Sequence, residues 1–450
     1  MAGLTPMMQQ YMETKKQYKD CILFYRLGDF YEMFFEDAIT ASRELEITLT
    51  GKDCGLEERA PMCGVPFHAV DGYLNRLVSK GYKVAICEQV EDPKLAKGIV
   101  KREVIRIVTP GTNLNTQALE ESKNNYLMCI ACFQNRIGVS IVDVTTGDFY
   151  MTEVEGLAKL QDEIYKYMPT EIICNDAFVM SGYDIEDLKG RLGMAVYTLE
   201  PWYFDDDGCR KCLMNHFKVN TLAGLGLEDF PSGMISAGAA MQYLLETQKT
   251  DLTHINHIIP YLASRFMLLD SSTRRNLELT ETLREKQKKG SLLWVLDKTK
   301  TAMGARRLRS DIEQPLINID DINARLDAVE QLCKNTVSRD EIREYLNPIY
   351  DMERLLGKVS YKSANPRDLL AFANSMEMLP HIKTVLKEFD CRLLSEIEQE
   401  MDGLEDLYHL IKDAICADPP VMIREGGMIR TGFDKDIDML RTAKTEGKSW

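Results

Sequence analysis

The pattern of the chain changes near residue 250. Before that point, strand-like apolar runs are interspersed with amphipathic helical segments, whereas after it the apolar spacing is helical almost throughout. A chain of 450 residues is also too long for one ordinary domain, so we expect about three domains, each with its own core. The sequence therefore predicts a multidomain α/β plus all-α protein.

Residues 1–115 predict a compact mixed α/β domain. Thr5-Pro6 matches an N-cap followed by proline at the first helical position, and the helix that it opens is expected to end near Asp20. A strand over Ile22 to Arg26 follows, and Gly28 ends it. A second helix, a polar loop, a Pro-rich turn with a third helix and two further strands complete the domain.

The second helix is predicted to begin at Phe30. Asp29 with Glu32 three residues later matches a capping box, and the helix carries one apolar stripe: Phe30, Phe34, Ala38, Ala41 and Leu45. Periodicity alone thus makes Phe30 a core residue and Glu32 a cap. In the first turn, however, a side chain leans toward the helix N-terminus. Phe30 could then project past the helix end as a wedge.

The next segments predict a linker at 116–124 and a second α/β domain at 125–245. Three strand-like runs, a helix near 157–167 and another strand indicate antiparallel hairpins followed by a crossover helix. The apolar helix Ser236 to Leu245 is expected to close this domain.

Residues 246–450 predict a helical domain. Asn365-Pro366 matches another capped helix start. The last stretch is amphipathic and reaches Trp450 without a capping glycine or a breaking proline, so we expect a truncated chain that lacks its continuation.

Composition narrows the classes of function. The net charge of −15 argues against a general polyanion binder, although the first 120 residues are nearly neutral, with 15 basic and 17 acidic side chains. Most of the twelve cysteines lie singly in apolar segments, as reduced thiols do. No run approaches the length of a membrane span, and no signal-peptide core is present. We expect a cytoplasmic protein.

Signals for metal binding or catalysis are poor. Cys129 and Cys132 fall in a predicted strand, where residues three apart face opposite sides and could not share a zinc ion. The sequence at 447–449 resembles the end of a phosphate-binding loop but lacks the leading glycine. Three acids could suggest a carboxylate metal site for a nuclease, although turn and surface roles fit them better: Asp143, Asp148 and Glu153.

Several long motifs closely resemble the MutS family of DNA mismatch-repair proteins. They include FYRLGDFYEMFFEDA, PMCGVPFHAVDGYLNRLVSKGYKVAICEQVEDP, LDSSTRRNLEL, GSLLWVLDKTKTAMGARRLRSDIEQPL and GGMIRTGFDKDID, in this order. The resemblance covers essentially the whole chain and is weakest at 125–245. It implies a mismatch-recognition domain, an RNase H-like connector without nuclease function and a helical core with lever helices.

The resemblance also implies a binding site. Phe30 and Glu32 match the family's Phe-x-Glu pair, in which the phenylalanine enters the minor groove and stacks on a mispaired base while the glutamate hydrogen-bonds to that base. Lys52 and Met62 match positions near the DNA, and Arg106 is a candidate for contact with the DNA backbone. The expected ligand is double-stranded DNA that contains a mismatch or a small loop.

In the family, the DNA clamp and the ATPase lie beyond the position of Trp450. The resemblance therefore implies no catalytic residue, metal or other cofactor in this chain, and ATP and Mg²⁺ only in the full-length protein. It also implies a homodimer at full length, a MutL-type repair partner and a bacterial, nucleoid-associated location. Two alternatives stay open at this point: a carboxylate-dependent structure-selective nuclease, and a MutS-like scaffold that binds DNA junctions. The intact Phe-x-Glu pair argues against the scaffold.

Overall fold

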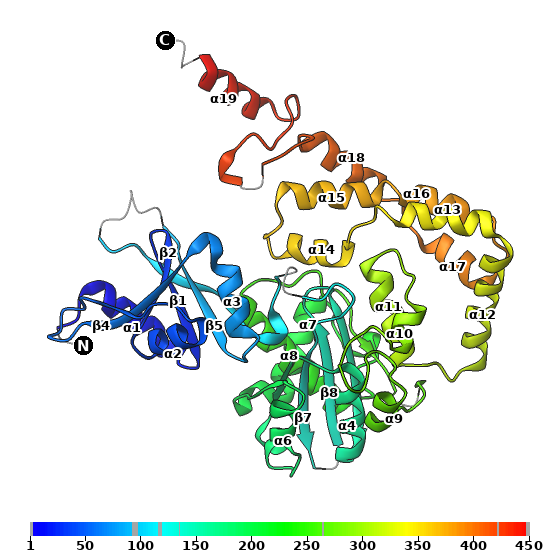
Figure 1. Ribbon diagram of the computed structural model, residues 1–450, viewed down its shortest axis with the longest axis horizontal. Helices are drawn as coiled ribbons and strands as arrows, with labels where there is room; N and C mark the ends of the chain where they lie inside the picture. Colours follow the sequence, from blue (N-terminus) through cyan, green and yellow to red (C-terminus); the bar gives the residue numbers. More distant parts are fainter. Residues whose placement is uncertain are drawn as a thin grey trace. The chain divides into compact units, whose positions relative to one another are not determined.

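The structure is a computed structural model that describes residues 3–91, 98–115, 119–134, 136–262, 265–420 and 423–446. The chain forms two compact units, one of Met1–Glu120 with Asn124–Ala263 and one of Glu121–Lys123 with Ser264–Trp450 (Figure 1). The first unit contains two mixed sheets and the second is helical. The predicted fold class of α/β plus all-α is confirmed.

The first sheet of the first unit has the strand order β3-β4-β2-β1-β5-β6. Only the β1 and β5 pair is parallel. Its strands are β1 (Cys21–Leu27), β2 (Phe30–Phe34), β3 (Thr50–Lys52), β4 (Ala60–Pro66), β5 (Lys83–Gln89) and β6 (Arg102–Val108). The hairpin of β1 and β2 therefore lies at the centre of the sheet, where every strand has a partner on both sides.

Helices cover both faces of this sheet. They are α1 (Pro6–Gln17), α2 (Phe35–Leu45) and α3 (Val70–Val78), with the short turns η1 (Phe67–Ala69) and η2 (Pro110–Thr112). Helices α2 and α3 pack Ala41 and Leu77 against one face. Helix α1 packs Met8 and Tyr11 against the other face. The prediction that Pro6 opens α1 is confirmed, although the Thr5 side chain makes no capping hydrogen bond.

The helix predicted from Phe30 is wrong in its first five residues. Residues 30–34 form β2, and α2 begins only at Phe35, whose φ of +54° marks the change of direction. The capping box is therefore absent, and Glu32 does not cap a helix. Gly28, with φ +57°, instead turns the chain so that Leu27 pairs with Phe30 in a tight hairpin. Pairing of β2 with two neighbours outweighs the local helical pattern.

The second sheet of the first unit has the order β11-β10-β7-β8-β9-β12. Its strands are β7 (Leu127–Phe133), β8 (Arg136–Asp143), β9 (Asp148–Glu155), β10 (Glu171–Cys174), β11 (Ala195–Thr198) and β12 (Ile259–Pro260). The predicted hairpins, crossover helix and following strand are confirmed. The helices are α4 (Gly156–Tyr167), α5 (Asp176–Val179), α6 (Ile185–Gly190), α7 (Asp206–Phe217) and α8 (Pro231–Gln248), with the turns η3 (Pro201–Phe204) and η4 (Ala223–Leu225).

Helix α8 fills one face of this second sheet and α4 the other. The Ser236 hydroxyl of α8 donates to the carbonyl of Cys129 at 2.8 Å, whereas Cys132 belongs to the core that Leu160 of α4 shares. The two cysteines thus face opposite sides of β7, as the pleat requires. At the start of α8, Gly138 of β8 lies so close to the backbone of Ser232 that an added Cβ would be 1.8 Å from its carbonyl oxygen.

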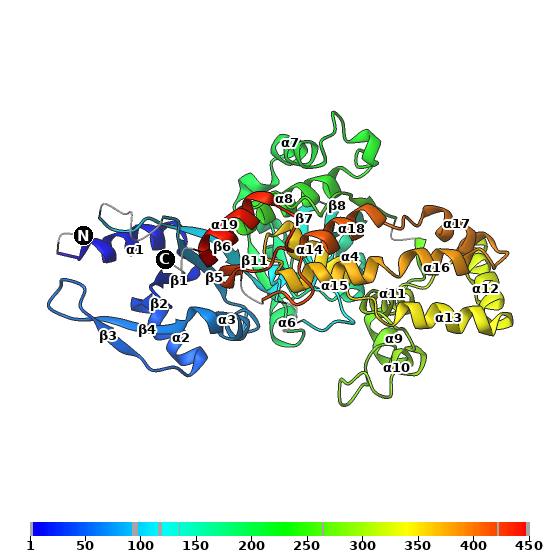
Figure 2. The same cartoon turned by 90° about the horizontal axis from the view of Figure 1, so that it is seen from above.

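The second unit is a succession of helices. They are α9 (Ser271–Asn276), α10 (Leu292–Leu296), α11 (Ala302–Glu313), α12 (Ile319–Lys334), α13 (Thr336–Leu346), α14 (Met352–Ser360), α15 (Pro366–Met376), α16 (Leu379–Leu386), α17 (Arg392–Glu400), α18 (Glu405–Ala414) and α19 (Lys435–Glu446), with the turn η6 (Ile423–Glu425). Asn365 forms the predicted capped start of α15, with a complete capping box to Asp368. Helices α13 and α16 lie side by side and share a core with α12 (Figure 2).

Among the described residues, none of the helices has the length and apolar character to cross a membrane. Two stretches that the sequence analysis singled out lie outside the described residues: part of the predicted linker, 116–118, and the sequence at 447–449 that resembles the end of a phosphate-binding loop. The predicted domain boundaries at 115, 125 and 246 stay predictions.

Candidate nucleic-acid interface

The candidate site is built on the hairpin turn between β1 and β2. Three contacts hold this turn. The amide of Phe67 donates to the carbonyl of Asp29 at 2.9 Å, and Nε of Arg26 donates to the carbonyl of Gly28 at 2.5 Å. The guanidinium of Arg26 lies 3.8 Å from the centroid of the Phe67 ring, which adds a cation–π contact. The residue that follows the turn therefore starts from a fixed backbone.

Side chains alternate along β2. Tyr31 and Met33 point into the core between the sheet and helices α2 and α3. Phe30 and Glu32 occupy the opposite face, because residues two apart on a strand share a side. Phe30 is 45% exposed, which is unusual for a large aromatic side chain on a central strand. The strand thus presents an exposed ring and an acid together.

Glu32 is partly buried and paired. Its Oε2 lies 2.5 Å from Nζ of Lys52, and the two side chains are 18% and 34% exposed. On β4, Gly64 lies opposite Glu32 in the register of the sheet. A Cβ at Gly64 would lie 3.5 Å from Cγ of Glu32 and 3.3 Å from the carbonyl oxygen of Tyr31, so glycine leaves the acid room beside the strand.

The other predicted site residues divide into two groups. Met62 lies opposite Phe34 on β4 and is partly buried in the core beneath α1, close to the Lys52 and Glu32 pair along the same strands. Arg106 instead lies on β6, which β1 and β5 separate from β2. The structure therefore brings Lys52 and Met62 to the neighbourhood of Phe30 and Glu32, and it places Arg106 at the other edge of the sheet.

The pairing of Lys52 with Glu32 and the role of Gly64 were not predicted from the sequence. The available signal was the Gly28-Asp29 pair between two aromatic-rich runs, which is compatible with a two-residue hairpin. That signal would have placed Phe30 and Glu32 on one face of a strand. It would not have identified Lys52 or Gly64, because the register of β4 is set by tertiary packing.

The three acids of the nuclease hypothesis are structural. Asp143 is fully buried and accepts hydrogen bonds from the amides of Asn125 and Thr145 at 3.0 and 2.8 Å. Asp148 accepts from the Thr146 hydroxyl at 2.8 Å, in the turn that was predicted. Glu153 accepts from the amide of Ser232 at 2.8 Å. Over the described residues no group of three potential metal ligands is found, and the three acids accept hydrogen bonds in turns and at the start of α8.

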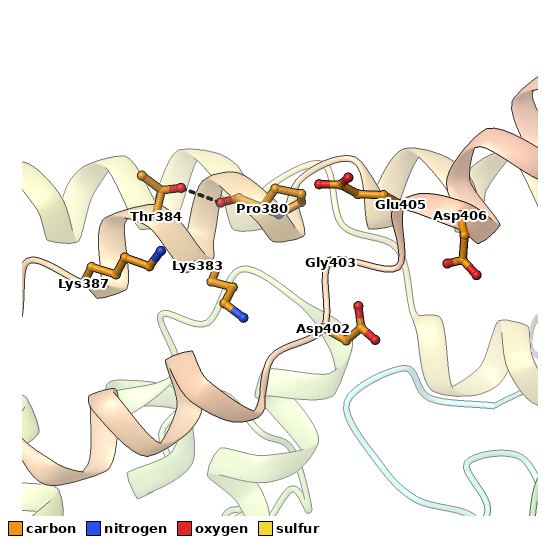
Figure 3. Close-up of a pocket in the computed structure, with 8 residues that line it drawn as sticks. All are labelled: Pro380, Lys383, Thr384, Lys387, Asp402, Gly403, Glu405 and Asp406. Atoms are coloured by element: carbon orange, nitrogen blue, oxygen red, sulfur yellow. Dashed lines mark hydrogen bonds between the residues drawn. The ribbon is translucent and has the colours of Figure 1, made fainter.

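An open pocket of about 460 Å³ lies on the second unit, between α16 and the start of α18 (Figure 3). Its lining mixes charges: Pro380, Lys383, Thr384, Lys387, Asp402, Gly403, Glu405 and Asp406. Nζ of Lys383 already donates to the carbonyl of Met401 at 2.7 Å. Two lysines and three acids thus share the lining, and neither sign of charge dominates it.

Comparison with known proteins gives one consistent answer. Family models described as MutS domain I, MutS domain II and MutS domain III match residues 5–117, 125–256 and 272–446. The DNA mismatch repair protein MutS of Lachnoclostridium phytofermentans is 66% identical over 450 residues, which are 100% of this chain and 48% of the relative. The protein of the same name from Ruminiclostridium cellulolyticum is 54% identical over 453 residues, 100% of this chain and 52% of the relative. The chain spans about half the length of the curated relatives it matches.

Proposed function

Because this chain belongs to the MutS family, we propose that its first sheet recognises mismatched or looped-out bases in double-stranded DNA through Phe30 and Glu32. The observation that carries the proposal is the arrangement of these two side chains. A half-exposed aromatic ring and a carboxylate lie two residues apart on one face of a central strand, directly after an anchored turn.

An exposed ring on a rigid strand is suited to act as a wedge. Inserting an apolar side chain between two base steps unstacks them at a cost of a few kcal/mol, and this cost is least where pairing is already poor. Such a step is also easier to kink, so the protein reads the deformability of the duplex rather than its sequence. The contacts of Asp29 and Arg26 fix the backbone beside Phe30, so this part of the backbone need not be ordered on binding.

The acid contributes discrimination. A carboxylate is repelled by the phosphates of any duplex, and this repulsion weakens binding to intact DNA. At a mismatch, a hydrogen bond from Glu32 to the displaced base offsets the penalty. Glu32 therefore discriminates between mismatched and intact duplexes more by weakening the complex with intact DNA than by strengthening the complex with mismatched DNA.

The remaining contacts follow from the same placement. Lys52 and Met62 lie near Glu32 on the strands beside it and are proposed to face the DNA at the mismatch. Arg106, on β6, is proposed to contact the DNA backbone away from the mismatch. From the family we also infer a homodimer, a MutL-type partner and the binding of ATP with Mg²⁺ in the full-length protein, and a cytoplasmic, nucleoid-associated location.

The test is a fluorescence-anisotropy titration with a G·T heteroduplex and its matched homoduplex at one fixed salt concentration. The protein is used at its full natural length, as wild type and as Phe30→Ala. We expect the wild type to prefer the heteroduplex, and Phe30→Ala to lose this preference while it keeps weak homoduplex binding. Ile39→Ala is the matched control, because Ile39 is 41% exposed but lies on α2, which covers the other face of the sheet.

Equal behaviour of wild type and Phe30→Ala would show that Phe30 does not read the mismatch. Loss of preference in Ile39→Ala as well would show that the effect is not specific to the proposed face. Mg²⁺-dependent cleavage of the heteroduplex by the wild type would instead support the nuclease hypothesis.

A further inference from the structure

We propose that Lys52 acts on DNA through Glu32, as the residue that positions the carboxylate for the mismatched base, rather than as an independent phosphate contact. This inference rests on the proposed function of Glu32 and adds to it. It starts from the 2.5 Å contact between Nζ of Lys52 and Oε2 of Glu32. Lys52 is one of three residues of β3, and Glu32 lies two strands away on β2.

The contact makes the two carboxylate oxygens of Glu32 different. Oε2 is held by the ammonium group, whereas across the described part of the chain no hydrogen bond to Oε1 is found. A glutamate side chain has three rotatable bonds, and an unpaired carboxylate on this strand would sample several orientations. With Oε2 fixed, Oε1 remains as the acceptor for a donor that approaches from outside the sheet.

The environment restricts the pair further. Nζ of Lys52 lies 5.5 Å from the centroid of the fully buried Phe34 ring, so the ammonium group is near an aromatic face as well as the acid. Gly64 leaves space for Cγ of Glu32 at van der Waals distance. The acid is therefore held by an ion pair, and it lies opposite a glycine on the neighbouring strand.

The pair also changes the charge that a duplex meets. Glu32 alone would repel phosphates, and Lys52 alone would attract them, without regard to sequence. Held together, the two charges attenuate each other away from the site, so the repulsion by Glu32 acts mainly on phosphates that come close to it. What remains is local: an acceptor oxygen in a fixed place, which can accept a hydrogen bond from a displaced base.

A double-mutant cycle separates this role from a plain phosphate contact. Four proteins of full natural length are compared: wild type, Lys52→Met, Glu32→Gln and the double variant. Each is titrated with the G·T heteroduplex and with the homoduplex. The measured quantity is the ratio of the homoduplex Kd to the heteroduplex Kd. For a partly exposed ion pair we expect Lys52→Met to lower the ratio about three- to fivefold. In the Glu32→Gln background the same substitution should leave the ratio unchanged, because the carboxylate that it positions is absent.

Two further variants complete the test. Lys52→Arg can still hold a carboxylate, so it should restore most of the ratio, which a loss of packing would not predict. Lys80→Met is the matched control: Lys80 pairs with Glu44 at 3.0 Å with exposures of 47% and 19%, at the α2 and α3 side of the sheet. It should leave the ratio at the wild-type value.

Each outcome decides the role. If Lys52→Met weakens both duplexes equally and does so with or without Glu32, Lys52 is a phosphate contact and the inference is overturned. If Lys52→Met and Lys52→Arg lower thermal stability with no change in ratio, Lys52 is only structural and the inference also fails. If the wild type shows no preference at all, the proposed function fails first, whatever the Lys52 variants do.

Discussion

The hydroxyl of Tyr243 donates a hydrogen bond to Oε1 of Glu171 at 2.6 Å, while the amide of Gly111 donates to Oε2 at 2.8 Å. Glu171 begins β10 and has no exposed surface, and Gly111 lies in η2, at the end of the first sheet. One buried carboxyl thus joins the two α/β parts of the first unit.

Burial raises the pKa of Glu171 above its ordinary value, because the surrounding protein disfavours the charged form. The stability that this shift contributes is complete below the unfolded pKa of about 4.3, and it is lost as the pH rises through the higher folded pKa. We therefore expect the stability of the wild type relative to Glu171→Gln to fall as the pH rises from about 4.3. Urea unfolding of both proteins at a series of pH values measures this difference. The same change of unfolding free energy with pH in both proteins would contradict the prediction.

Gly138→Ala should destabilise the second sheet of the first unit. The new Cβ would lie 1.8 Å from the carbonyl oxygen of Ser232, so β8 and α8 must separate. Forced overpacking of this kind costs about 3 kcal/mol of unfolding free energy. Gly190→Ala is the control, since nothing lies within 4 Å of the Cβ position there. Thermal unfolding should show a large loss for Gly138→Ala and little change for Gly190→Ala, and equal values would disprove the predicted close approach.

Arg306→Met should destabilise the helical unit. Arg306 is buried, and its guanidinium contacts both carboxylate oxygens of Asp351 at 2.6 and 2.7 Å and Glu353 at 2.6 Å. Removing the arginine takes the closest cation from a partly buried acid, since Nε of Arg354 lies 3.8 Å from Oδ2 of Asp351, and we expect a cost of about 3 kcal/mol. Arg307→Met is the control, because Arg307 is 69% exposed and pairs across one helical turn with Asp311. In limited proteolysis, the second unit should be cleaved faster in Arg306→Met than in the wild type, whereas Arg307→Met should be cleaved at the wild-type rate.

Phe30→Ala and Phe34→Ala should differ in stability, although both residues lie on one face of β2. Phe34 is fully buried beneath α1, and its truncation should cost about 3–5 kcal/mol. Phe30 is half-exposed, and its truncation should cost about 1 kcal/mol or less. Denaturant unfolding of the two variants tests this difference. A large loss of unfolding free energy in Phe30→Ala would show that Phe30 is a core residue, as the helical pattern suggested.

The sequence predicted the type and order of many elements, chiefly of the first unit, because their signals are local. Proline at the first helical position marks α1 and α15, and apolar runs between turn residues mark β7, β8 and β9. Each of these signals depends on residues a few positions apart, and tertiary packing did not oppose them.

The stretch at 30–34 misled the prediction because two patterns coincide there. Phe34, Ala38, Ala41 and Leu45 are buried, as the helical stripe implied, but the first of them belongs to a strand. Spacings of four residues fit both a helix face and an even-numbered step along a strand. Residues 30–34 form a strand because β1 and β4 pair with β2 from both sides, and β4 is distant in sequence.

The alternation along β2 also restricts how this stretch can vary. Inserting or deleting one residue between Gly28 and Phe34 would exchange the two faces, so that Tyr31 and Met33 would leave the core beneath α2 and α3 and Phe30 and Glu32 would enter it. Substitutions can adjust what the exposed face binds, whereas a change of length would remove the exposed face and the core together. Variants that keep the function should therefore tolerate some substitutions between Gly28 and Phe34 but no insertion or deletion of one residue there.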